Sequence, residues 1–114
     1  RAQTMTPRAG DVVLVDLGDM PFGNEQGGIR PAIFVYAEGN VALLVPLSSN
    51  TKRLRFKATA LIESDDSNRL ASPSVALIFQ MRAVDHRRVL RRVGTLSISH
   101  KRAINKVLRS TILM

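Results

Sequence analysis

Short apolar runs separated by polar and glycine-containing turns occupy residues 11–81. Runs rich in β-branched and other apolar residues are typical of strands. The pattern predicts strands at residues 11–17, 31–36, 41–47, 51–61 and 74–81. A turn at residues 38–40 separates the second of these strands from the third.

The segment at residues 51–61 alternates most regularly. Its apolar positions 54, 56 and 58 would lie on one face of a strand, and its cations at 53, 55 and 57 on the other. Such a strand can be an edge strand protected by charge, or it can follow the phosphates of a nucleic acid. The pattern leaves both interpretations open.

The last third of the chain changes to a helical pattern. Residues 82–93 fit either a continued strand or a basic turn, and we expect Gly94 to end that segment. A helix is expected to begin at Ser99, whose hydroxyl can cap the first backbone amides. Apolar residues then recur at helical spacing and form one stripe, made up of Ala103, Ile104, Val107, Leu108, Thr111 and Ile112.

Strands followed by a single helix predict an α+β fold. We expect a small, strongly bent antiparallel sheet or barrel that is closed by a C-terminal helix. A chain of 114 residues suffices for one domain and one core. Residues 1–9 are expected to be a short disordered lead, and residues 10–114 a single domain. Because helices do not alternate with strands, a parallel nucleotide-binding sheet is not expected.

The amino-acid composition limits which kinds of functional site the chain can form. The chain has no cysteine and two histidines, His86 and His100. This excludes disulfides, thiolate zinc sites and histidine-rich metal centres within one chain, and we expect no metal and no cofactor. No apolar run approaches the ~18 residues of a membrane span, and residues 1–9 contain no signal-peptide core. A cytoplasmic protein without membrane association is therefore expected.

Positive charge is concentrated near the C-terminal end. The chain carries 17 basic and 9 acidic residues, a net charge of +8. Residues 1–81 hold 8 residues of each sign, whereas residues 82–114 hold 9 basic residues and a single acid, Asp85. Such a block attracts polyanions, although a solvated cationic face without a dedicated partner would look the same.

Polar residues gather at two predicted strand ends, where functional groups are common on a rigid scaffold. A glycine-rich loop at residues 18–28 leads into the second strand and places Glu25 five residues before Arg30. Ser48, Ser49 and Asn50 follow the third strand. If the second and third strands pair, both places reach one cleft.

An arginine, a hydroxyl and a carboxylate are sufficient for RNA cleavage. A guanidinium clamps a phosphate, a hydroxyl donates to it, and a carboxylate accepts a proton. The 2′-hydroxyl of RNA is the nucleophile, so the protein must hold the phosphate in line and neutralise its developing charge. A structural interpretation fits equally well, in which Arg30 pairs with a carboxylate and Ser48 caps a turn.

Several segments resemble those of one protein family in sequence and in order. G-D-V-V-L-V-D-L followed by G-N-E-Q-G-G-I-R-P-A-I-F-V is similar to the opening signature of the MazF/PemK-like toxins, the ribonuclease halves of bacterial toxin–antitoxin pairs. V-P-L-S-S-N, S-V-A-L-I-F-Q-M-R-A-V-D, V-G-T-L and a terminal amphipathic helix follow. The resemblance covers roughly residues 10–112, and E-Q-G-G-x-R-P-A is its most specific part.

The resemblance implies a small SH3-like antiparallel β-barrel of the MazF/CcdB type with a C-terminal helix, paired as a homodimer. It implies metal-independent cleavage of single-stranded messenger RNA at a short motif, leaving 2′,3′-cyclic phosphate and 5′-hydroxyl ends. The family's catalytic arginine falls on Arg30, its proposed proton acceptor on Glu25 and its catalytic threonine on Ser48. A cognate antitoxin with an acidic disordered tail is the implied protein partner, and the basic third of the chain could bind that tail, RNA or both.

Two positions depart from the family pattern. Serine at position 48 keeps the hydroxyl but lacks the methyl group that restricts its rotamer. Phe79 stands where many members carry an acid, so no role of that acid applies here. Aromatic residues are scarce, which argues against exposed stacking platforms for bases. We instead expect polar RNA contacts, from Gln26, Gly27, Ser49, Asn50, Arg53, Gln80 and Arg82.

These observations favour a sequence-specific messenger-RNA endonuclease toxin, in which Arg30, Ser48 and Glu25 are catalytic. One alternative is a non-catalytic SH3-like RNA-binding module. Another is a toxin of related fold that poisons DNA gyrase, for which the E-Q-G-G-x-R-P block would have no RNA to act on.

Overall fold

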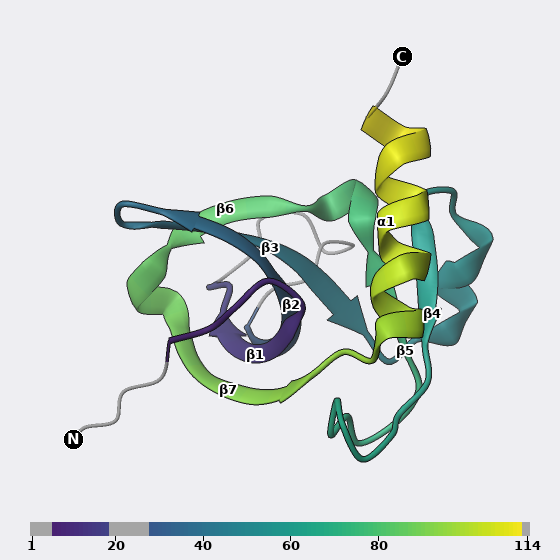
Figure 1. Ribbon diagram of the computed structural model, residues 1–114, viewed down its shortest axis with the longest axis horizontal. Coiled ribbons are helices and arrows are strands. Elements are labelled where there is room, and N and C mark those ends of the chain that lie inside the picture. The colour runs from purple at the N-terminus through teal and green to yellow at the C-terminus, as the bar shows by residue number, and fades with distance from the viewer. Residues whose placement is uncertain (1–5, 19–27, 113–114) are drawn as a thin grey trace.

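The computed structural model describes residues 6–18 and 28–112. Seven strands and one helix make up the fold (Figure 1). The strands are β1 (Asp11–Asp16), β2 (Ile29–Glu38), β3 (Val41–Ser48), β4 (Thr59–Ile62), β5 (Ser74–Leu77), β6 (Arg82–Asp85) and β7 (Val89–Thr95). The helix is α1 (Ile98–Ile112), and three short 3₁₀ turns are η1 (Thr51–Arg55), η2 (Ile78–Gln80) and η3 (His86–Arg88).

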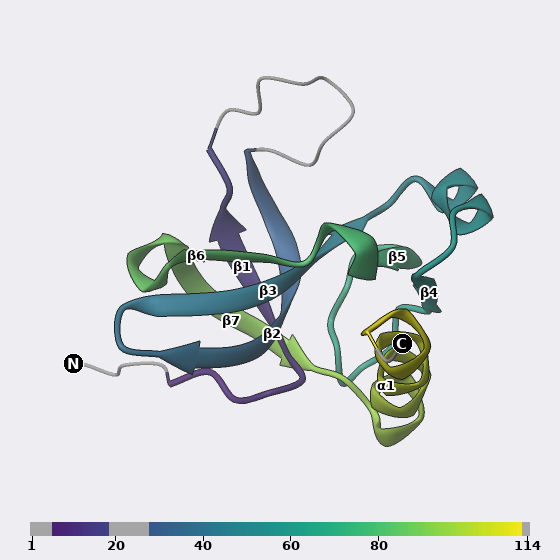
Figure 2. The same cartoon turned by 90° about the horizontal axis from the view of Figure 1, so that it is seen from above.

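All strands pair antiparallel in one sheet of order β4-β5-β3-β2-β1-β7, and β6 also pairs with β3. β3 is the hub: it pairs with β2 and β6 along most of its length and with β5 through Leu47 and Ser48. A strand that changes partners in this way forces the sheet to bend, as Figure 2 shows. The predicted α+β fold, a bent antiparallel sheet with a C-terminal helix, is confirmed.

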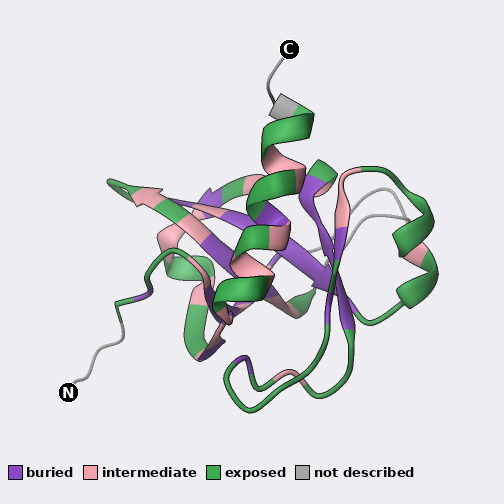
Figure 3. Cartoon of the chain, turned by 45° about the vertical axis from the view of Figure 1, so that its right-hand side comes forward, coloured by how far each residue is buried: buried purple, intermediate pink, exposed green. Residues whose placement is uncertain are grey.

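The two faces of the bent sheet bury separate apolar clusters. Alternate residues of β2 and β3 point to opposite faces, so Ile33 and Val45 join the cluster under α1, while Phe34 and Leu44 join the cluster inside the curl of β1, β2 and β3. Ile104 of α1, 4% exposed, completes the first cluster. Figure 3 shows α1 lying across the buried strands.

The predicted strand at residues 51–61 is wrong over its first part. Residues 51–55 form η1, and β4 begins only at Thr59. The side chain of Asn50 accepts a hydrogen bond from the backbone N–H of Lys52, which starts the turn. Ala58 has a positive φ of 58°, so the chain bends again just before β4. The two alternating faces expected here therefore do not exist.

Three boundaries near the C-terminal end also differ from expectation. Residues 82–93 form β6, η3 and the start of β7, and Gly94 lies inside β7 rather than ending it. The helix begins at Ile98, and its first turn is capped by Ser97, whose Oγ accepts from the N–H of His100 at 3.3 Å. Ser99, the expected cap, is already helical.

The described part of the expected lead, residues 6–9, packs against the sheet. Pro7 is buried, and the N–H of Arg8 donates to Oδ2 of Asp11 at 2.9 Å. The division into a lead and a single domain stays a prediction.

Candidate functional site

β2 begins and β3 ends toward the same end of the sheet, and β6 begins beside the middle of β3. β2 begins at Ile29, β3 ends at Ser48 and β6 begins at Arg82, and both neighbours run antiparallel to β3. Antiparallel neighbours place the start of one strand beside the end of the other. The structure therefore assembles this edge from segments that are far apart in the sequence.

Arg30 and Ser48 lie just beyond the paired part of β2 and β3. The pairing of these strands ends at Ala32 and Pro46, and Arg30 and Ser48 each lie two residues past this pair, where Ser48 pairs with Val75 of β5 instead. Both positions have the parity of Phe34 and Leu44, whose side chains point into the curl of the sheet. The pairing of β2 with β3, on which the expected common cleft depends, is present. That Arg30 and Ser48 act together stays a prediction.

Ser48 is held from within the protein. The residue is 4% exposed, and its Oγ accepts a hydrogen bond from the N–H of Asn50 at 3.2 Å. The turn-capping role left open by the sequence is therefore present. Because a hydroxyl has one donor and two acceptor sites, this bond leaves the hydroxyl proton available. Arg30 is half-buried, so it lies nearer the solvent than Ser48.

Arg82 lies on the same face as Arg30. It pairs with Leu44 of β3 and has the parity of Val84, which is buried inside the curl. Leu44 lies four positions before Ser48 on β3, which corresponds to about 13 Å along a strand. Gln80 closes η2 just before β6, and both Gln80 and Arg82 are partly exposed.

The predicted contacts after β3 lie at the start of η1. Ser49 and Asn50 are exposed, and Oδ1 of Asn50 is engaged by Lys52 at 3.2 Å. Arg53 is partly exposed, and its Nε is buried without an acceptor among the described residues. A guanidinium N–H in this condition is satisfied only when an acceptor is brought to it.

Glu25, Gln26 and Gly27 lie outside the described residues, so their roles stay predictions. The base of the loop that carries them is paired. The N–H of Leu17 donates to the carbonyl of Gly28 at 2.8 Å, and the N–H of Gly28 donates to the carbonyl of Gly18 at 2.7 Å. The same base is held by Arg88, which donates to the carbonyl of Asp16 at 3.2 Å. Sequence analysis missed Arg88 because its contact spans 72 residues.

Part of the C-terminal positive charge is compensated internally. Arg87 binds Asp85 at 3.0 Å, and Arg92 binds the buried Asp11 at 3.3 Å. Hydrogen bonds from Arg87 lower the pKa of the Asp85 carboxyl to about 2. Along α1, the cations Arg102, Lys106 and Arg109 lie exposed on the surface, with no carboxylate within salt-bridge distance in the described part of the chain. This helix surface contributes uncompensated positive charge.

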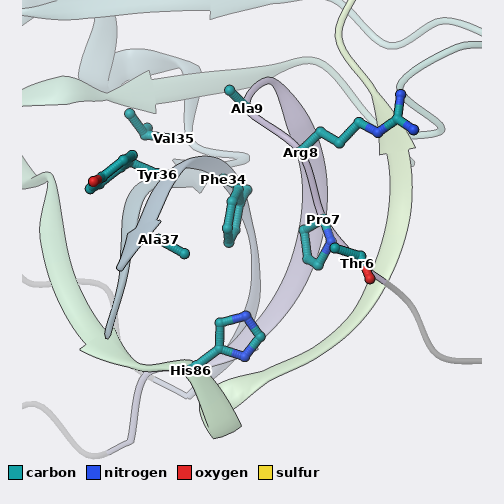
Figure 4. Close-up of a pocket in the computed structure, with 9 residues that line it drawn as sticks. All are labelled: Thr6, Pro7, Arg8, Ala9, Phe34, Val35, Tyr36, Ala37 and His86. Atoms are coloured by element: carbon teal, nitrogen blue, oxygen red, sulfur yellow. The ribbon is translucent and has the colours of Figure 1, made fainter. Parts of the chain in front are cut away.

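A hollow of about 360 Å³ lies at a different place, between residues 6–9, residues 34–37 and His86 (Figure 4). The described residues that line it include none of the predicted site residues. Within residues 6–18 and 28–112, no three histidine, aspartate or glutamate side chains gather closely enough to hold a metal ion. In the same part of the chain, no helix is both long enough and apolar enough to cross a membrane.

Known proteins with similar sequences and structures share this small, bent antiparallel sheet. The family described as the PemK-like, MazF-like toxin of type II toxin–antitoxin systems matches residues 8–112. The chain belongs to this family, which confirms the resemblance seen in the sequence. The Endoribonuclease MazF of Staphylococcus saprophyticus is 32% identical over 105 residues, which cover 89% of this chain and 87% of that protein.

Solved structures show the same fold. MazF from Deinococcus radiodurans superposes with a TM-score of 0.77 at 21% identity, covering 97% of this chain and 100% of that one. A MazE–MazF structure from the same organism gives a TM-score of 0.73 at 21% identity, covering 97% and 99%. The arrangement of β1–β7 and α1 is therefore the MazF fold.

Proposed function

We propose that this protein is the toxin of a type II toxin–antitoxin pair and an endoribonuclease that cleaves single-stranded messenger RNA at a short motif. Cleavage requires no metal and leaves 2′,3′-cyclic phosphate and 5′-hydroxyl ends. Membership of the toxin family and the similarity to a relative named as an endoribonuclease support the class of reaction. The observation that carries the proposal is the antiparallel pairing of β2 with β3 up to Ala32 and Pro46, because Arg30 and Ser48 each lie two residues beyond that pair.

The reaction needs one phosphate and one ribose. The 2′-oxygen attacks the adjacent phosphorus, Glu25 accepts the 2′-hydroxyl proton, and the departing 5′-oxygen takes a proton from water. Arg30 lies against the scissile phosphate and neutralises the charge that develops on its oxygens. Ser48 donates its hydroxyl proton to one of those oxygens. The hydrogen bond that Oγ accepts from the Asn50 amide uses an acceptor site and leaves this proton available.

The burial of Ser48 sets the order of contact. A hydroxyl on a residue that is 4% exposed reaches only a group that enters the end of the sheet. A phosphate that enters there meets the more exposed Arg30 first. Arg30 is therefore the principal phosphate ligand, and Ser48 acts from the inner side of the same site.

Flanking nucleotides meet polar groups on both sides. Ser49, Asn50 and Arg53 lie after β3, and Gln80 and Arg82 lie at the start of β6. Gln26 and Gly27, which lie between β1 and β2 in the sequence, are proposed to add further contacts. Phosphate contacts of this kind make binding weaken steeply as the salt concentration rises.

The toxin is proposed to act in the cytoplasm as a homodimer that a cognate antitoxin inhibits. The Deinococcus radiodurans structure that contains both MazE and MazF supports a partner of this type. An acidic disordered antitoxin tail would complement the cations of residues 82–114. If it covers the site as well, RNA is excluded while the antitoxin is bound.

The test is to incubate the purified full chain with a long single-stranded RNA in EDTA and to map the ends. Discrete cuts with 2′,3′-cyclic phosphate ends support the proposal. RNA that stays intact but shifts in a gel supports a binding module. Intact, unshifted RNA together with trapped gyrase–DNA complexes supports the gyrase alternative. Cleavage that requires a divalent metal would contradict the mechanism.

A further inference from the structure

Two phenylalanines that are 23 positions apart in the sequence meet at the surface next to the site. Phe56 follows η1 and Phe79 lies in η2, and their ring centroids are 5.7 Å apart with an interplanar angle of 58°. The N–H of Phe79 donates to the carbonyl of Ala58 at 3.2 Å, which fixes the two turns to each other. Phe56 is 40% exposed and Phe79 is 46% exposed, so ring surface remains open to solvent.

The segment that carries Phe56 is rich in cations. The guanidinium carbon of Arg55 lies 4.8 Å from the centroid of the Phe56 ring. Lys52, Arg53 and Lys57 belong to the same short segment, and residues 49–62 contain no acid. The buried, acceptor-free Nε of Arg53 belongs to this segment as well. Within residues 6–18 and 28–112, no carboxylate lies within salt-bridge distance of these cations. Open aromatic rings and cations are the two ingredients of single-stranded nucleic-acid sites.

The ring pair lies where an RNA strand would leave the proposed active site. η1 begins three residues after Ser48, and η2 leads directly through Gln80 to Arg82. Ser48 also pairs with Val75 of β5, and β5 leads into η2. Both the segment after Ser48 and the segment after its β5 partner therefore lead to the rings, and we expect an RNA strand held at Ser48 to extend toward them.

We propose that Phe56 and Phe79 form a stacking subsite for a base that flanks the scissile phosphate, with the cations of residues 52–57 contacting the adjoining backbone. This inference rests on the proposed nuclease function. It revises the expectation, drawn from the scarcity of aromatic residues, that stacking platforms are absent. Every nucleobase has a π face, so this subsite strengthens RNA binding without defining the cleavage motif.

The positive charge beside Phe56 and Phe79 favours RNA over a protein segment as the ligand of this surface. A docking surface for an apolar peptide does not need a guanidinium over one of its rings and further cations in the same segment, whereas a nucleotide presents a flat base and an anionic phosphate together. An acidic peptide with an aromatic or aliphatic anchor is the competing occupant, and the experiment separates the two.

The experiment uses the full chain and synthetic RNAs that contain the mapped cleavage motif with its flanks. Each flanking nucleotide in turn is replaced by an abasic ribose, and KM and kcat are measured. For the wild type, one or two flanking positions should raise KM about tenfold when the base is removed. In Phe56→Leu and Phe79→Leu, which keep apolar volume but lose the π face, the same abasic substitution should have little effect. This non-additivity identifies the interacting pair.

Tyr36→Leu is the matched control, because Tyr36 is an exposed aromatic (56%) near the opposite end of β2. It should keep the full abasic penalty. As a check that needs no variant, 4-thiouridine at the sensitive position should cross-link the wild-type protein at Phe56 or Phe79.

Each outcome has one meaning. If the wild type cuts no RNA, the proposed function fails. If it cuts but shows neither flanking abasic sensitivity nor cross-links at the rings, only the subsite is overturned. If both leucine variants cut RNA normally but resist inhibition by an acidic antitoxin peptide, the rings bind protein instead, and the proposal is overturned.

Discussion

Replacing Ser48 by alanine separates the structural role of its hydroxyl from the catalytic one. The structure shows one hydrogen bond to lose, from the N–H of Asn50 to Oγ at 3.2 Å. Such a bond contributes about 1 kcal/mol. Asn50 is exposed, so water can replace the lost acceptor, and we expect the lower half of the usual range. A domain stable by ~5–15 kcal/mol therefore stays folded.

The expected effect on cleavage is much larger. A preorganised donor aimed at a developing oxyanion is worth about 10²–10³ in kcat. Ser48→Ala should therefore lower the cleavage rate at saturating RNA by ~10²-fold or more, while its midpoint of chemical unfolding barely moves. Single-turnover cleavage of a labelled RNA and denaturant unfolding measure the two effects separately.

Ser74→Ala is the matched control. Ser74 is also buried (5% exposed), lies on β5 next to Val75, the partner of Ser48, and donates its hydroxyl to the carbonyl of Ser72 at 3.1 Å. It should destabilise the protein by a similar ~1 kcal/mol and leave cleavage unchanged. If Ser48→Ala cuts RNA as fast as Ser74→Ala does, the hydroxyl is only a turn cap and its catalytic assignment is refuted.

Gly94→Ala should lower the free energy of unfolding by ~3 kcal/mol or more, because an added Cβ would lie 2.5 and 2.6 Å from the carbonyl oxygens of Ser67 and Asn68. Urea unfolding measures this change, and a loss of less than about 1 kcal/mol would contradict the prediction. Asn68→Ala should cost ~2–4 kcal/mol in the same assay, since this fully buried amide makes hydrogen bonds within its own loop. The pKa of the Asp85 carboxyl is lowered to about 2, and the largest cause is the side-chain hydrogen bond from Arg87. Its stabilising interaction is therefore complete above about pH 4 and is lost as the pH falls through 2, and a carboxyl NMR titration of Arg87→Ala should show the pKa returning toward 3.8.

The sequence predicted the fold where local pattern and tertiary structure agree. The apolar runs of β1 and β3 and the middle of β2 are buried as expected. In the stripe of α1, Ile104 is buried and Val107 and Leu108 are partly buried, whereas Thr111 is exposed. The pairing of β2 with β3 was also predictable, because only a short turn joins the two strands, whereas the joint role of Arg30 and Ser48 stays a prediction.

The errors come from contacts that a local pattern does not contain. Residues 51–58 alternate like a strand, but the Asn50 side chain stabilises a 3₁₀ turn instead. Gly94 resembles a strand breaker, yet it is the residue that allows β7 to pass close to the 67–68 backbone. Ser97 and Ser99 are chemically equal candidates for the helix cap, and the end of β7 at Thr95 decides between them. The pairing of Phe56 with Phe79 depends on two turns that no local signal connects.

The central claim is that a guanidinium at position 30 carries the cleavage of RNA. The direct measurement is the initial rate of cutting of one end-labelled RNA, in EDTA and at low salt, by wild-type protein, Arg30→Ala and Arg69→Ala. Arg69 is an exposed arginine on the loop after β4, and its removal tests for a general loss of charge. The account predicts that Arg30→Ala stays folded but is slower by about 10²–10³-fold, and that Arg69→Ala cuts normally. Equal rates for Arg30→Ala and the wild type would contradict it.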